Sequence, residues 1–290
     1  MGADVMRRGQ IAIWGCVAVA AATAIVAGVR PSDAASALRP EFTVAICNAR
    51  APRLAHAWVQ AITVAPSGMV IPAAAAAISN ADHAELLFKL GLLEGHLMVA
   101  QELIDAKQPR LALPHFGHPV RELYDDISDE LHRRGISGFD GELVSLEAFA
   151  AGKPNDPAFG AQYGKVIGIV AAIRATVPAG LLDSPPFMLG VLGEIAATAA
   201  EEYSESIEGG RIEKPIEYHD SRGYLAYADK ELRRLEARPE ERGTLVDARA
   251  KLTELQAIVG PLLPPERPSA SVAAYKAIVV QFKQAALPRA

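Results

Sequence analysis

From His83 onward, apolar residues repeat with a helical period, and this repeat constrains the fold more than any other feature of the chain. In the first such stretch, spacings of four and three residues place large side chains on one face of a helix that ends near Ala106. The members of that face are Leu86, Leu90, Leu93, Leu97, Ala100 and Ile104. No stretch alternates between apolar and polar residues in the way a half-buried strand does. The sequence therefore predicts an all-α chain.

The later helices are separated by short turns that contain proline or glycine. We expect a connecting stretch over residues 110–116, followed by a helix with His118 at its cap and Pro119 at its first position. Further helices are expected near residues 140–151, 159–176, 187–207, 215–237, 245–259 and 269–286. Short connections favour antiparallel neighbours, so the fold class is an antiparallel helical bundle.

A duplication is one interpretation of the helical pattern. When Gly95 is aligned with Gly223, Leu97 meets Leu225, and the apolar positions that follow also coincide. The chain would then hold two related bundles packed together, with halves at residues 81–178 and 186–290. The alternative is that two unrelated bundles obey the same packing rule.

Residues 1–37 have the order of features of an export signal. Arg7 and Arg8 precede an apolar run over residues 11–29, and small residues follow at Ala35 and Ala37. The run is also close to the roughly 20 residues of a membrane span, so an uncleaved N-terminal anchor (a transmembrane helix) is the alternative. Either reading places the rest of the chain in the periplasm or on the outer face of the cell envelope.

The remainder divides into a leader and a domain. Residues 38–80 contain four prolines and no sustained period, which predicts a poorly ordered linker, and residues 81–290 form the helical-bundle domain. Cleavage after Ala37 would leave Cys47 as the single cysteine, so the core must hold the fold without an internal disulfide. The net charge of −5 and the lack of a basic block argue against nucleic acid as a partner. We expect membrane contact only through the N-terminal segment, and the sequence specifies no protein partner.

Histidines are the most distinctive polar residues, and two of them are placed to bind a metal. His115 and His118 are three residues apart at the expected helix entrance, and Glu122 follows one turn later. Two imidazoles and a carboxylate can supply three donors to a divalent transition metal, such as iron, copper or zinc. The alternative is that His118 only caps the helix and His115 packs in the connection.

His96 lies at the flank of the first helix and is a further candidate ligand. It is about 15 Å from the end of that helix at ~1.5 Å per residue. Antiparallel packing would then place it opposite Asp125 or Asp129, which predicts two separate polar spots. In the alternative interpretation, His96 is a half-buried side chain with an ordinary polar partner.

A second polar concentration follows Pro215. Tyr218, His219 and Arg222 lie in the first turns of a predicted helix, where they could bind an anionic or metal-bound ligand. Acidic neighbours suit a helix N-terminus, so a role in starting the helix is the alternative.

No catalytic motif stands out. The chain has no Gly-x-Ser-x-Gly turn and no His-Glu-x-x-His helix, so we expect a non-enzymatic protein. The first hypothesis is an exported metal-binding bundle that uses His115, His118, Glu122 and His96. The second is a structural or protein-interaction module without a ligand, and the third is a hydrolase that pairs His96 with Asp125.

Residues 86–131 resemble an element of the imelysin-like exported helical-bundle proteins of bacterial envelopes. The resemblance lies in the helix, the short turn and the second helix with His and Glu, together with the duplicated plan. The Gly-x-His-x-x-Glu marker of that family is replaced here by Gly95-His96 and Gly117-His118. The resemblance implies a helical bundle in the cell envelope that handles iron or another metal without turnover.

Overall fold

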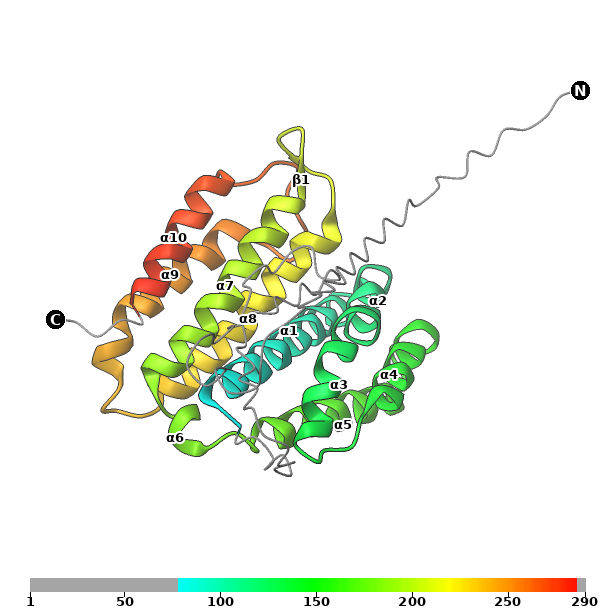
Figure 1. Cartoon of the computed structure of the whole chain (residues 1–290). Coiled ribbons are helices and arrows are strands. Elements are labelled where there is room, and N and C mark those ends of the chain that lie inside the picture. The colour runs from blue at the N-terminus through cyan, green and yellow to red at the C-terminus, as the bar shows by residue number, and fades with distance from the viewer. Residues whose placement is uncertain (1–77, 286–290) are drawn as a thin grey trace, which may run out of the picture. The chain divides into compact units, whose positions relative to one another are not determined.

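Helices form nearly all of the secondary structure in residues 78–285, the range that this computed structural model describes (Figure 1). The predicted all-α bundle is therefore confirmed. The predicted signal or anchor at residues 1–37 lies outside the described residues, as does the predicted linker apart from its last three positions. The described residues belong to one compact unit.

The first part of the domain consists of a long helix followed by shorter ones. Ser79 caps the long helix, because its side chain accepts a hydrogen bond from the backbone of Asp82 while Asp82 bonds back to Ser79. The elements are α1 (Asn80–Asp105), α2 (Pro109–His118), the π-helix η1 (Pro119–Leu123), α3 (Tyr124–Arg133), α4 (Asp140–Gly152) and α5 (Pro157–Arg174).

The second part is a bundle of four helices that follow the short helix α6 (Ala179–Leu182). These four are α7 (Pro185–Glu205), α8 (Pro215–Glu236), α9 (Arg242–Val259) and α10 (Val272–Gln284). Between α7 and α8 the two-residue strands β1 (Ile207–Glu208) and β2 (Arg211–Ile212) pair antiparallel. Gly209 and Gly210 form their turn with φ of 57° and 78°, values that glycine adopts readily.

The centre of the domain is the packing of α1 against α8, with α7 and α2 on either side (Figure 1). Every member of the predicted apolar face of the first helix is buried there. Small residues bring the two helices close: a Cβ on Gly223 would lie 2.9 Å from the carbonyl carbon of Gly95. The two glycines paired in the sequence alignment are therefore in contact, and α1 and α8 cross at this point.

One local prediction is wrong, and a second holds only in part. Residues 110–116, expected as a connection, form most of α2, because Pro109 starts a helix that continues through His118. The predicted helix start holds in position, because His118 is the N-cap residue of η1 and Pro119 is its first residue. His118 nevertheless keeps helical dihedral angles, with φ −56° and ψ −45°, and makes no side-chain capping hydrogen bond. The chain passes directly into η1, whose first residue Pro119 has no N–H to donate to the preceding turn.

None of the helices in the described range combines the length and the apolar character that crossing a membrane requires.

Candidate metal centre

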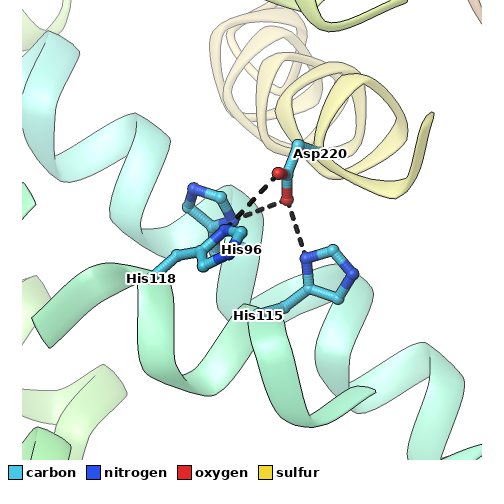
Figure 2. Close-up of side chains that lie close together, drawn as sticks. All are labelled: His96, His115, His118 and Asp220. Carbon is cyan, nitrogen blue, oxygen red and sulfur yellow. Dashed lines mark hydrogen bonds and ion pairs between the residues drawn. The ribbon is translucent and has the colours of Figure 1, made fainter. Parts of the chain in front are cut away.

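Four polar side chains from three helices meet beside the α1/α8 crossing (Figure 2). His96 comes from α1, His115 and His118 come from successive turns of α2, and Asp220 comes from the second turn of α8. One ligand atom of each residue, either an imidazole nitrogen or a carboxylate oxygen, lies within 4.8 Å of the other three. The three helices thus supply the cluster jointly, and no single segment contains it.

The carboxylate of Asp220 is the point on which the imidazoles converge. Nδ1 of His115 is 2.7 Å from Oδ1 in a hydrogen bond, and Nδ1 of His96 is also 2.7 Å from that oxygen. Nδ1 of His118 is 3.6 Å from Oδ2. All three histidines therefore turn the same ring nitrogen toward one carboxylate, as the dashed lines in Figure 2 show.

The contact between His96 and Asp220 is close but lacks hydrogen-bond alignment. Nδ1 of His96 is buried and has no hydrogen-bond partner among the described residues, although Oδ1 is so near. The short distance alone does not make a hydrogen bond, because hydrogen bonds weaken steeply away from linearity. Nδ1 of His96 is thus a buried nitrogen whose hydrogen bonding the described cluster does not satisfy.

Burial and charge set the protonation of the cluster. Burial alone would raise the pKa of Asp220, but the imidazoles of His96, His115 and His118 outweigh it and hold this pKa well below its ordinary value. Burial lowers the pKa of His115, against the opposing effect of the Asp220 carboxylate. Near neutral pH the site therefore contains a carboxylate and a neutral His115, which are the forms that bind metals.

His118 is the most exposed member of the cluster. The side chain of His118 is 19% exposed, whereas those of His96, His115 and Asp220 are at most 6% exposed. His118 is therefore the one member of the cluster that solvent reaches to any extent.

The structure brings together three of the four residues predicted as metal ligands and corrects the grouping. The prediction that His96 would form a separate spot with Asp125 or Asp129 is wrong, because His96 faces Asp220, whereas both aspartates on α3 are exposed. The helical course of residues 110–116 causes the difference, since it places His115 and His118 beside α1. Glu122 belongs to η1, and its side chain lies outside the described residues.

The residues predicted to bind a ligand near the start of α8 contact the loop after α9. Tyr218 donates a hydrogen bond to the carbonyl of Pro261 at 2.6 Å, and Nε2 of His219 lies 3.0 Å from the carbonyl of Leu262. Arg222 pairs with Glu102 of α1 and donates to the carbonyl of Gly260. These contacts fix the loop to α8, and a ligand role for Tyr218, His219 and Arg222 stays a prediction.

Sequence reasoning missed Asp220 as a member of the cluster. The signal was the glycine pair: helices in contact at Gly95 and Gly223 must also bring together residues within a turn of each glycine. His96 follows Gly95, and Asp220 precedes Gly223 by three residues. The alignment paired these two glycines, but neither ancestry nor a shared packing rule implies that they touch.

A model of a known protein family matches the C-terminal part of the chain. Residues 178–286 match the family model described as an iron permease-associated four-helix bundle domain, a range that covers α7 to α10. Asp220 lies inside the matched range, whereas the three histidines lie before it. No curated protein and no solved structure matches the chain. The match thus links the C-terminal bundle to a metal-related family, and the resemblance to imelysin-like proteins stays a prediction.

Proposed function

We propose that this protein binds one divalent transition-metal ion through His96, His115, His118 and Asp220, with iron(II) as the first candidate. The observation that carries the proposal is the convergence of three Nδ1 atoms and a carboxylate in a largely buried space. The protein would act without turnover, as a metal-binding component of the cell envelope.

The residues present fit such an ion in number and in charge. Three imidazoles and one carboxylate supply four donors, and this mixture suits iron, zinc and copper. A buried carboxylate also needs a compensating charge, because an unpaired charge is costly to remove from water. In the metal-free protein the imidazoles stabilise the carboxylate of Asp220. A bound cation would take over that role.

The choice of iron rests on the matched family, whose description names an iron permease. A protein associated with iron transport would hold the ion as cargo, to be taken up and passed on. The partly exposed His118 fits this use, because it leaves one ligand within reach of solvent or of a partner. The envelope location rests on Arg7, Arg8 and the apolar run over residues 11–29.

Anaerobic titration calorimetry with Fe(II), followed by Zn(II) and Cu(II), tests the proposal. We expect one site per chain in the wild type, and its loss in Asp220→Asn and in the double variant His115→Ala/His118→Ala. His132→Ala is the matched control, because His132 is an exposed histidine on α3 outside the cluster. That control should bind as the wild type does.

The competing interpretation is a structural cluster in an interaction module. The hydrogen bond of 2.7 Å between His115 and Asp220 favours it, since buried polar groups are normally paired. It predicts no metal binding by the wild type, together with a lower melting temperature in Asp220→Asn. That pair of results would refute the metal proposal and leave the structural one.

A further inference from the structure

Tyr224 of α8 reaches the side of His96 that faces away from Asp220. Its hydroxyl lies 2.8 Å from Nε2 of His96, and the two rings meet edge to face with their centroids 5.2 Å apart. Tyr224 is 4% exposed and His96 is 3% exposed, so water does not compete freely for this contact. His96 is therefore hydrogen-bonded through Nε2, while its Nδ1 lies beside the Asp220 carboxylate.

We infer that Tyr224 is a positioning residue of the proposed metal site, which keeps Nδ1 of His96 turned toward Asp220. This inference rests on the proposed function and names a residue that the donor set does not include. Loss of the Tyr224 hydroxyl should lower the metal affinity of the site without abolishing the site.

The proton on the ring explains why this contact matters. An imidazole that binds a metal through Nδ1 carries its remaining proton on Nε2, and a buried N–H needs an acceptor. A hydroxyl can accept or donate a hydrogen bond. Tyr224 can therefore pair with Nε2 of His96 whether that nitrogen carries the proton or not. The hydroxyl can therefore hydrogen-bond to His96 in both the metal-free and the metal-bound site.

The backbone fixes the position of Tyr224. Gly95 and Gly223 directly precede His96 and Tyr224, and the helices touch at these glycines. A Cβ on Gly95 would lie 2.8 Å from Cδ1 of Tyr224, so the tyrosine ring packs over the backbone of α1. The ring therefore has little freedom to turn, and its hydroxyl is held at a fixed position beside Nε2 of His96.

His115 provides a contrast within the same cluster. Its Nε2 is buried and has no hydrogen-bond partner among the described residues. Tyr224 thus supports one histidine and not the other. Removing its hydroxyl should affect the orientation of His96 while leaving the hydrogen bond between His115 and Asp220 in place.

The test compares Tyr224→Phe with Tyr227→Phe in the full chain. Tyr227 lies one turn further along α8, is 1% exposed, and makes no hydrogen bond to a residue of the cluster. Zn(II) affinity is measured by competition with a chromophoric chelator. We expect Tyr224→Phe to bind one Zn(II) with about 10–100-fold lower affinity, the usual effect of losing such a supporting group. Tyr227→Phe should bind as the wild type does.

A second measurement reports on orientation and not on fold. In the ¹H–¹⁵N spectrum of the Zn(II)-loaded wild type, His96 should be bound through Nδ1 and show a slowly exchanging Nε2 proton. That protection should disappear in Tyr224→Phe, with the other histidine signals unchanged.

The outcomes separate this inference from the proposed function. Equal Zn(II) affinity in Tyr224→Phe and the wild type would overturn the role of Tyr224 and leave the metal site intact. Equal weakening in both tyrosine variants would also overturn it, because a general loosening of the core would then be the cause. If the wild type bound no Zn(II), both proposals would fail.

Discussion

Replacing Gly223 by alanine should force α1 and α8 apart. The new Cβ would stand 2.9 Å from the carbonyl carbon of Gly95 and 3.1 Å from Cγ1 of Val99. The nearest atoms belong to the backbone of a long helix, which cannot move aside as a flexible side chain can. Overpacking of this kind costs about 1–3 kcal/mol, and a rigid backbone favours the upper part of that range.

The helix itself would gain from the substitution, because alanine is better than glycine by about 1 kcal/mol in a helix interior. The net loss in the free energy of unfolding should therefore be about 1–2 kcal/mol. For a domain of this size, that corresponds to a fall in melting temperature of roughly 2–4 °C for each kcal/mol. Urea denaturation followed by circular dichroism measures the free energy directly.

Gly190→Ala is the matched control. Gly190 lies inside α7, where an added Cβ would meet nothing within 4 Å. Only the helix-propensity term remains, so this variant should be more stable than the wild type by about 0.5–1 kcal/mol. We therefore expect Gly223→Ala to lower the free energy of unfolding and Gly190→Ala to raise it. If Gly223→Ala stabilised the protein as much as Gly190→Ala, the close crossing of α1 and α8 would be refuted.

Three further outcomes follow from burial and charge. Leu97→Ala should lower the free energy of unfolding by about 2–5 kcal/mol, because Leu97 is fully buried in the core. Glu102→Ala should cost at most about 1 kcal/mol, since its two-bond pair with Arg222 is partly exposed. In the metal-free protein, burial is the main cause that lowers the pKa of His219 to about 4, and the nearby His115 and Arg222 lower it further. The Leu262 carbonyl and Asp220 act in the opposite direction. The unfolded chain, with an ordinary imidazole pKa of about 6.5, then binds this proton first, so stability should fall as the pH drops from about 6.5 to about 4. Urea melts at pH 7 and pH 4.5 should show this loss, and His219→Gln should reduce it.

The helices were predictable because the spacing of apolar residues, one every three or four positions, is specific to a helix. The face from Leu86 to Ile104 repeats every three or four residues, and only a helix places all of these side chains in one core. The helix α2, which ends at His118, was not predictable by the same rule. Residues 110–116 are too few for a clear period, and Pro119, which does begin η1, draws attention away from the earlier helix start at Pro109.

The candidate site was predictable in residue type but not in grouping. The short spacing of His115 and His118 marks them as neighbours, since three residues are about one helical turn. The approach of His96 and Asp220 depends on how α1, α2 and α8 pack, and 124 positions separate these two residues along the chain. Gly95 and Gly223 are the sequence feature that relates to this packing. They predict it only if the two glycines are known to be in contact, and the structure supplies that knowledge.

X-ray absorption at the metal edge of the Zn(II)-loaded protein tests the central claim most directly. We expect scattering from three imidazole nitrogens at about 2.0–2.1 Å from the zinc and from one carboxylate oxygen at about 2.0–2.2 Å. In Asp220→Asn and in His115→Ala/His118→Ala this pattern should be lost, while His132→Ala should reproduce the wild type. A wild-type spectrum of a hydrated ion without imidazole scattering would contradict the assignment of His96, His115, His118 and Asp220 as a metal centre.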